Sequence, residues 1–485
     1  MADAVFTNSG LLSVIAEFTS TGALDLVSQA VKVANRPILK HRLTQEATEK
    51  YMNSGMFRER LNRRVERPWT QLSFTLNVGR APSRWPRNAL LLSATTSLDL
   101  FYTKDFSPLT SFRNLRTLSV RSENTYSVRF GRPRISHLPL LESLAIEGLP
   151  EGLQGISDLP KLTSLTLKVP SFGVSFLVSG SERLNLGPLA AFSNLQVFRA
   201  PGFQFRSLQP LAALAQLREL DLSNQNETPR GSAFYSPLAE LKNLEVLHLA
   251  AEAPLRGGEH PRLGFLPNLK KLKDLDLCGF AEDWSVLAEL PQLEKLRLSD
   301  SVDVAYLAQI PRLKDLSVQG VKMIKNLPLL NAIPFLHTLD VAKTNFADLA
   351  HIAGLRNLSR LFCSRSQLQD LSSFAVGFAN IRELWIGGSN VSDITALANA
   401  KNLAVLDLMH SEVADLGPLG GLLRLEKLNI SGLRLLTLES LLTVTSLRML
   451  AIKNLVLTDD SALKTLQTRG VQTDWLVWLE EVGTL

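Results

Sequence analysis

The chain has 485 residues, of which 45% are hydrophobic and 20% are charged, and its formal net charge is +6. This composition is typical of a folded soluble protein, and the lack of any run of 18 apolar residues excludes a hydrophobic membrane-spanning helix. Asp3 stands where a signal peptide has basic residues, and Glu17 interrupts the only apolar run nearby. We therefore expect no signal peptide and a location in the cytoplasm or nucleus.

Amphipathic segments open the chain and predict short helices. The helices are expected over about residues 9–20, 23–35, 38–51 and 54–67. Ser9 is placed to cap the first helix. Residues 1–67 are therefore predicted to form a small all-α domain.

One stretch of the chain is strongly basic. Residues 36–87 hold twelve Lys and Arg residues and four acids, so the rest of the chain is close to neutral. One interpretation is a solvated basic helix beside the rest of the fold. The others are a surface for an acidic partner and, as a third function class, an RNA-binding surface. Without a known RNA-binding motif, we do not expect nucleic acid to be the partner.

The segment "SGLLSVIAEFTSTGALDLVSQAVKVANRPILK" (9–40) resembles the F-box family. The matching features are "LLSVIAEF" (11–18), the break at Gly22 and "ALDLVSQAVKVANR" (23–36). The resemblance implies docking on a Skp-type linker subunit of a cullin ubiquitin ligase. The apolar set for that contact is Leu11, Leu12, Ile15, Leu24 and Leu26. The usual Leu-Pro opening is missing, so a plain helical cap over the following repeats is the alternative.

The phrase apolar-x-x-apolar-x-apolar recurs fifteen times in the rest of the chain. The mean spacing is about 24 residues, a period that predicts a solenoid. Looser copies precede them near Phe74 and at Thr95. The fifteen copies start at Leu115, Leu141, Leu162, Leu195, Leu217, Leu244, Leu272, Leu293, Leu313, Leu336, Leu358, Ile381, Leu403, Leu425 and Leu447.

Each copy ends in a short alternating strand, and a second apolar set follows on the return path, as at Val413, Leu416, Leu419 and Leu422. This pattern resembles the leucine-rich repeat family, in the subclass with repeats of about 22 residues. The resemblance implies an α/β solenoid with a parallel sheet on its concave side. Where the subclass carries asparagine, this chain has Ser301, Thr344, Ser366, Ser389 and Ser411. A hydroxyl donates and accepts hydrogen bonds, so we expect it to replace the amide.

The early repeats carry insertions, at 121–134, 171–183 and 253–262, whereas those from Leu272 onward are regular. After the last repeat, residues 458–470 predict a capped helix, with Asp459 near its start. Trp475 and Trp478 follow and are expected to seal the final repeat's apolar edge. The predicted domains are therefore 1–67, the solenoid 68–456 and a C-terminal cap 457–485.

Catalytic signatures are missing from the sequence. It has no phosphate-binding loop, no H-E-x-x-H and no paired C-x-x-C, and its seven histidines are scattered. We expect no enzyme activity, no metal site and no cofactor. The two cysteines, Cys278 and Cys363, lie four repeats apart, which is too far for a disulfide, so we expect them to be core thiols.

The residue between the last two apolar positions of each repeat is expected to point out of the concave sheet. Most of these residues are small or polar, but Phe362 and Trp385 are large aromatics on neighbouring strands. Exposed aromatics and arginines are typical of binding hot spots. The predicted partner-binding set is Arg360, Phe362, Arg382, Trp385, Asp407, Met409 and His410. The alternative is that the two aromatics fold into the edge of the core.

These features predict a protein–protein interaction protein. One hypothesis is an F-box-like substrate adaptor for ubiquitin ligation, in which the repeats bind the substrate. The alternative is a scaffold or regulator outside the ligase system, or a pathogen effector.

Overall fold

The computed structural model describes residues 41–43, 74–78, 95–101, 106–121, 129–130, 134–147, 149–150, 153–169, 183–224, 234–251, 263–280, 284–299, 301–473 and 478. The chain divides into two compact units, Met1–Leu222 and Ser223–Leu485. Each unit contains a series of short parallel strands that are supplied by successive repeats.

In the first unit every strand pairs in parallel with the strand of the next repeat. The two looser copies form strands, as the sequence predicted. The series is β1 (His41–Leu43), β2 (Phe74–Val78), β3 (Thr95–Phe101), β4 (Thr117–Arg121), β6 (Ser143–Glu147), β8 (Ser164–Lys168), β9 (Val197–Arg199) and β10 (Glu219–Asp221). Beside this series β5 (Arg129–Phe130) pairs with β7 (Leu149–Pro150).

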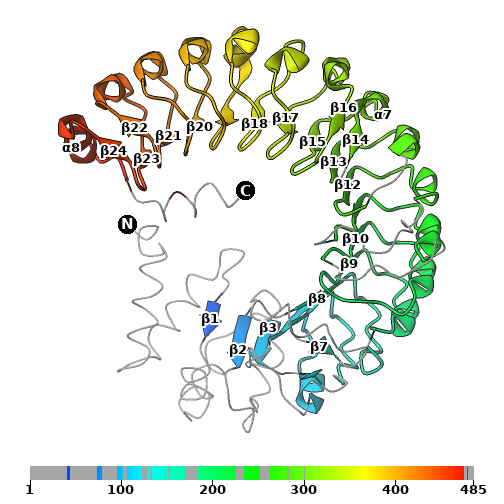
Figure 1. Cartoon of the computed structure of the whole chain (residues 1–485). Helices are drawn as coiled ribbons and strands as arrows, with labels where there is room; N and C mark the ends of the chain where they lie inside the picture. Colours follow the sequence, from blue (N-terminus) through cyan, green and yellow to red (C-terminus); the bar gives the residue numbers. More distant parts are fainter. Residues whose placement is uncertain are drawn as a thin grey trace, which may run out of the picture. The chain divides into compact units, whose positions relative to one another are not determined.

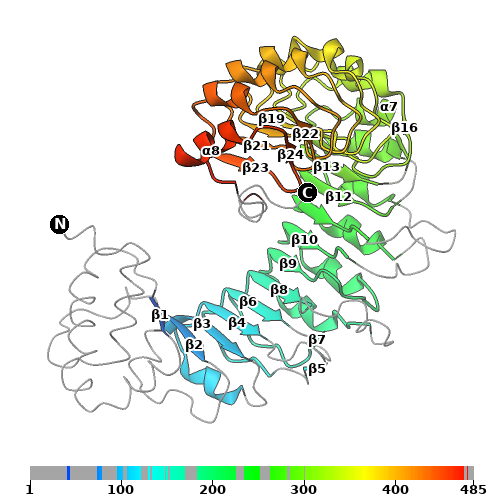
Figure 2. The same cartoon turned by 60° about the vertical axis from the view of Figure 1, so that its left-hand side comes forward.

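In the second unit the strands line the inner side of a curve (Figures 1 and 2). They are β11 (Val246–His248), β12 (Asp274–Leu277), β13 (Lys295–Leu298), β15 (Asp315–Ser317), β17 (Thr338–Asp340), β18 (Arg360–Phe362), β19 (Glu383–Trp385), β20 (Val405–Asp407), β21 (Lys427–Asn429) and β23 (Met449–Ala451). All pairings in this series are parallel and in constant register, with each central leucine opposite the next.

The return paths are short 3-10 helices, which lie on the outer side of the curve in the second unit (Figure 1). Those of the first unit are η2 (Ser107–Ser111), η3 (Gly187–Ala191) and η4 (Gln209–Ala213). Those of the second are η5 (Ser236–Glu240), η6 (Leu266–Asn268), η7 (Trp284–Glu289), η8 (Leu327–Ala332), η9 (Leu349–Ile352), η10 (Ser372–Phe374), η11 (Gly377–Asn380), η12 (Thr395–Asn399), η13 (Gly417–Gly421) and η14 (Glu439–Thr443). One return path holds the α-helix α7 (Val304–Leu307), between β14 (Val302–Asp303) and β16 (Ile324–Lys325).

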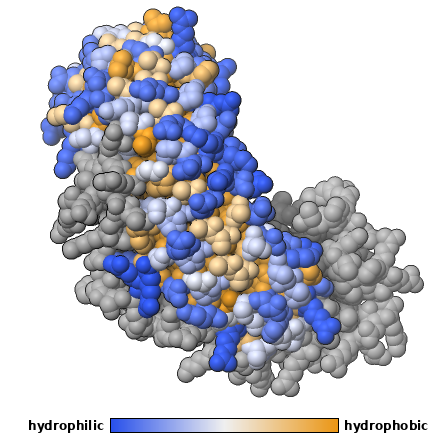
Figure 3. Space-filling view, turned by 90° about the vertical axis from the view of Figure 1, so that its right-hand side faces the viewer, coloured by the Kyte–Doolittle hydropathy of each residue, from blue (hydrophilic) through white to orange (hydrophobic). Residues whose placement is uncertain are grey.

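The core lies between the strands and the return paths. Both apolar sets that the sequence identified are buried, including Leu403, Leu406, Leu416 and Leu419. Because each leucine layer contacts only the layers of neighbouring repeats, no repeat buries its side chains alone. The outer face mixes hydrophilic residues with scattered apolar ones (Figure 3).

Side-chain oxygens hold some of the turns at the predicted hydroxyl positions, whereas Ser411 Oγ is buried and makes no hydrogen bond with a described residue. Thr344 Oγ1 donates to the Val341 carbonyl at 2.6 Å and accepts from the Phe346 N–H at 3.2 Å. Ser389 Oγ donates to the Ile386 carbonyl at 2.6 Å. These bonds stay within one turn, so the hydroxyls close their own repeats and do not form a ladder between repeats.

The C-terminal cap is a helix followed by a short bridge. Helix α8 (Ser461–Thr468) begins after Asp459, whose Oδ1 accepts the Ser461 N–H at 2.9 Å, and it buries Leu466. Next to it β22 (Arg434–Leu435) pairs with β24 (Val456–Leu457). After the helix Gln472 pairs with Met449 and covers the free edge of β23. The predicted capped helix is confirmed.

The structure corrects one prediction at the N-terminal side. Residues 41–43 form β1 and pair with β2, so the helix predicted over 38–51 is wrong for these three residues. A strand of this length is fixed by its pairing partner, which a local pattern does not reveal. The other predicted N-terminal helices, with Leu11, Leu12, Ile15, Leu24 and Leu26, lie outside the described residues, as do most of the three insertions. In the part of the chain that is described, no helix is long and apolar enough to cross a membrane.

Candidate functional site

The concave face of the second unit presents two side chains per strand, on either side of the buried central leucine. The third strand residue forms one continuous row, because the strands pair in constant register. Along the chain this row contains His248, Asp276, Arg297, Ser317, Asp340, Phe362, Trp385, Asp407, Asn429 and Ala451. It changes character after Asp340, and the two parts are described separately.

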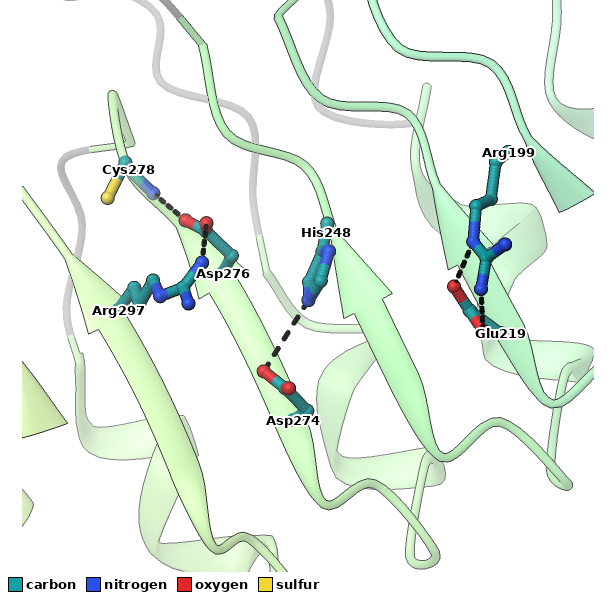
Figure 4. Close-up of polar contacts among 7 residues, drawn as sticks. All are labelled: Arg199, Glu219, His248, Asp274, Asp276, Cys278 and Arg297. Carbon is teal, nitrogen blue, oxygen red and sulfur yellow. Dashed lines mark hydrogen bonds and ion pairs between the residues drawn. The ribbon is translucent and has the colours of Figure 1, made fainter. Parts of the chain in front are cut away.

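The polar region comprises the concave side chains of β11 to β17, and its charges pair across neighbouring strands. His248 Nε2 lies 3.5 Å from Asp274 Oδ1, and Arg297 Nη1 lies 3.5 Å from Asp276 Oδ2 (Figure 4). Ser317 Oγ donates to Asp340 Oδ2 at 2.9 Å. Within the first unit Figure 4 also shows a two-point ion pair between Arg199 and Glu219, with 2.7 Å from Nη2 to Oε2.

The carboxylates of the polar region also bind their own turns. Asp276 Oδ1 accepts the Cys278 N–H at 3.1 Å, and Asp340 Oδ1 accepts the Ala342 N–H at 3.0 Å. Burial acts to raise the pKa of Asp274, but the hydrogen bond and charge of His248, with nearby cations, outweigh it, so the pKa is lowered. The ionised form of Asp274 is therefore stabilised. For Asp340, in contrast, burial outweighs the Ala342 N–H, Ser317 and the nearby cations, so its pKa is raised. The polar region therefore pairs its charges with its own neighbours but holds carboxyls that are shifted in both directions.

The two free cysteines are not reactive sites. Burial raises the pKa of Cys278 to about 12, and burial also raises that of Cys363. Because the thiolate is the reactive species, both thiols stay protonated at neutral pH. Among the described residues no group of three or more His, Cys, Asp or Glu is arranged to hold a metal ion.

The aromatic platform, defined as Phe362, Trp385 and Met449, occupies the other part of the concave face. Phe362 and Trp385 are opposite each other on β18 and β19, as predicted, and their rings stack with centroids 5.8 Å apart at 21°. Trp478, from the C-terminal segment, lies over Trp385 with ring centroids 6.1 Å apart at 59°. Together with Met449 and Ala451 these residues form a buried apolar cluster, separate from the leucine core.

The prediction that Phe362 and Trp385 face solvent is wrong. Each side chain is only 5% exposed, because the cluster with Trp478 covers the concave side of the strands. The alternative, that the two aromatics are buried at the edge of the core, fits better, because they lie in a buried apolar cluster on the side of the strands opposite Leu361 and Leu384. Trp478 was expected to seal the final repeat's apolar edge; it shares a cluster with Met449 and Ala451 of the last strand, β23, and it also contacts Trp385 of β19. Trp475 lies outside the described residues.

One polar atom of the platform has no partner. Trp385 Nε1 is buried and makes no hydrogen bond with any residue of the described structure. A buried N–H without an acceptor loses its hydrogen bond to water and gains nothing in return. Trp478 therefore covers the platform by apolar packing, and no described residue accepts a hydrogen bond from Trp385 Nε1.

Asp407 follows Trp385 in the same row and is almost fully buried. Its Oδ1 accepts the Met409 N–H at 3.1 Å. Burial raises the pKa of Asp407 to about 6, against the opposing effects of the Met409 N–H and Asn429. Gly387 leaves room for this carboxyl, because a Cβ there would approach Asp407 Oδ2 to 2.6 Å.

The other predicted site residues lie around the platform. Arg360 is placed beside it, with Cζ 5.4 Å from the Phe362 ring centroid and Nε 3.2 Å from Glu383 Oε2. Arg382 is exposed before β19, and Met409 and His410 lie in the turn after β20. Sequence reasoning missed Met449 as a platform residue. The signal available was an apolar residue at a strand position that elsewhere carries charge, as in Arg360 or Lys427.

No protein-family model matches the chain, and no curated protein matches its sequence. Several solved structures are similar. A leucine-rich repeat protein of Leptospira interrogans has 16% identity and a TM-score of 0.52, over 82% of this chain and 100% of that chain. An internalin of Listeria monocytogenes has 20% identity and a TM-score of 0.50, over 71% of this chain and 89% of that chain. The structure of the TLR13–ssRNA13 complex has 19% identity and a TM-score of 0.50, over 81% of this chain and 64% of that chain. These similarities, with the register above, show that the fold is a leucine-rich repeat solenoid.

Proposed function

We propose that the chain is a protein-binding scaffold and that its partner contacts the aromatic platform of the second unit. The observation that carries the proposal is the stacked pair Phe362 and Trp385, held on the concave side of rigid neighbouring strands. Tryptophan and other large aromatics dominate the energetics of protein interfaces, and a solenoid's concave sheet presents them on a fixed surface. Arg360 at the rim adds a charged donor beside Phe362.

The test is the affinity of a partner that co-purifies with the full chain. Replacing Phe362 and Trp385 with Ala is expected to weaken that affinity by at least about 30-fold, the equivalent of the 2 kcal/mol hot-spot threshold. The matched control is Leu436→Ala, because Leu436 is a large apolar residue that is 74% exposed outside the platform. Equal affinity of the double variant and the control would contradict the proposal.

A finer form of the proposal is that the scaffold is an F-box-like adaptor of a cullin-type ubiquitin ligase. The support is the resemblance of residues 9–40 to the F-box family, ahead of a repeat array. A purified Skp-type linker subunit is the probe. It should bind the full chain and not a chain that lacks residues 1–50, while the melting transition of the repeats is retained. If the linker subunit does not bind the full chain, the adaptor role is wrong and the protein is a scaffold of another system.

A further inference from the structure

One residue of the C-terminal segment, Trp478, lies on the candidate binding surface. Gln472 pairs with Met449 at the edge of β23, and Trp478 then lies against Trp385 of β19. Trp385 lies on β19, three places before β23 in the strand series, so Gln472 and Trp478 contact different strands. A cap needs to cover only the last repeat, which α8 and Gln472 already do.

The contact that Trp478 makes is apolar. Its ring packs within the cluster of Phe362, Trp385, Met449 and Ala451, and it is 2% exposed. It removes a large aromatic surface from water, which favours the closed arrangement. Yet Trp385 Nε1 remains buried without an acceptor among the described residues. The occupant therefore matches the shape and apolar character of the platform but not its hydrogen-bonding capacity.

We propose that Trp478 is a built-in occupant of the ligand position, and that the partner displaces it with a protein segment that carries an aromatic side chain and a hydrogen-bond acceptor for Trp385 Nε1. This inference rests on the proposed function. The partner's aromatic side chain replaces the packing of Trp478, and its acceptor supplies the hydrogen bond that no described residue makes with Trp385 Nε1. A buried donor strongly discriminates between ligands that satisfy it and ligands that do not.

The energetic logic is that of a tethered competitor. A segment joined to its own site acts at a high effective concentration, so a free ligand of equal intrinsic affinity is excluded. A partner that gains a further hydrogen bond overcomes this competition, whereas an apolar side chain alone does not. The closed state thus screens the platform from non-specific apolar contacts.

The experiment uses the full chain and a fluorescein-labelled peptide of residues 470–485. The Trp478→Ala chain is expected to bind this peptide at least tenfold more tightly than the wild-type chain, whose own segment competes. A peptide with Trp478→Ala is the matched control and should bind at least tenfold more weakly. If the variant chain and the wild type bind the peptide equally, or if the control peptide binds as well, the inference is overturned.

Two further variants serve as controls for this experiment. If Trp478→Ala melts as low as a core variant such as Leu406→Ala, Trp478→Phe keeps a ring in place, and its peptide affinity should lie between those of the wild type and Trp478→Ala. An affinity equal to that of the wild type would overturn the inference.

Trp385→Phe, made in the Trp478→Ala chain, removes the five-membered ring of the indole together with its N–H donor and keeps a six-membered aromatic ring. It should change peptide binding less than threefold and weaken the co-purified partner at least tenfold. A partner unaffected by Trp385→Phe would overturn the acceptor claim.

The two proposals fail differently. If the peptide behaves as expected but the partner ignores the Phe362→Ala/Trp385→Ala variant, the proposed function is wrong and the internal contact is only a cap. If the partner needs the platform but the peptide never binds, the function stands and the role of Trp478 as occupant is wrong.

Discussion

The polar region and the aromatic platform are built on different strands of one parallel series with the same register and the same kind of leucine layers, yet they differ in how their polar groups are paired. In the polar region His248 and Arg297 pair with the carboxylates of β12, and the pKa of Asp274 is lowered. Next to Trp385, burial raises the pKa of Asp407 to about 6, and the groups that oppose this shift are the Met409 N–H and Asn429, which carry no charge. The comparison indicates that the polar region pairs its charges across strands, whereas Trp385 Nε1 on the platform has no hydrogen-bond acceptor among the described residues.

The largest expected effect tests whether both regions depend on the same kind of buried leucine layer. Leu275 lies beneath the polar region and Leu406 beneath the platform side, and both are fully buried. Leu275→Ala and Leu406→Ala should each lower the free energy of unfolding by about 2–5 kcal/mol. Hydrogen exchange should rise mainly in the repeats on either side of each substitution. A uniform loss of protection along residues 301–473 would contradict a nearest-neighbour array.

The second-largest effect is the pH dependence of stability that arises from the raised pKa of the buried Asp407. Its folded-state pKa of about 6 lies above the ordinary 3.8, so the folded state binds the proton more tightly, and stability falls as pH rises from about 4 to about 6. Above pH 6 the loss is complete and amounts to roughly 3 kcal/mol. Asp407→Asn should recover about this amount at pH 7 and remove the slope between pH 4 and 6. Urea unfolding at several pH values measures both.

The neighbouring strand supplies the reason to choose asparagine. Asn429 holds the equivalent position, and its Oδ1 accepts the Ser431 N–H at 3.0 Å, as Asp407 does for Met409. The substitution therefore keeps the turn bond and removes only the charge. A variant that is less stable than the wild type at pH 7 would show that the carboxylate is needed.

The opposite sign is expected for Asp274 in the polar region. Because the pKa of Asp274 is lowered, its contribution is present above the ordinary pKa and is lost as pH falls through the folded-state value. Asp274→Asn should therefore decrease stability at pH 7, by less than Asp407→Asn increases it. If both substitutions change stability with the same sign, the electrostatic distinction between Asp274 and Asp407 is wrong.

The repeat period predicted most of what these tests rely on. The leucine register, the parallel strands and the helix of residues 461–468 follow from local patterns, and the structure confirms them. The turn hydroxyls are confirmed at Thr344 and Ser389 but not at Ser411. The closure over Phe362 and Trp385 did not follow, because Trp478 lies beyond the last repeat and its contact joins positions far apart in sequence. The burial of Asp407 was missed for the same reason, since it depends on surroundings and not on its place in the repeat.

The smallest effect lies at the boundary between the regions. Arg360 contacts the Phe362 ring and pairs with Glu383, but its side chain is 48% exposed. Arg360→Ala should lower stability by at most about 1 kcal/mol, and less at high salt, because exposed ion pairs and cation–π contacts are weak. Thermal melting at two salt concentrations measures the difference. A larger loss, unchanged by salt, would mean that Arg360 supports the platform through packing alone.

The most direct test compares the two regions as binding surfaces in one measurement. In the Trp478→Ala chain, either Phe362 or Arg297 is replaced with Ala, and the affinity for the 470–485 peptide is measured for both, with melting curves to confirm folding. Phe362→Ala should weaken binding at least tenfold, because its ring forms part of the platform. Arg297→Ala should change it less than twofold, because Arg297 serves the polar region. Equal losses from both substitutions, or a loss from Arg297→Ala alone, would contradict the division of the concave face.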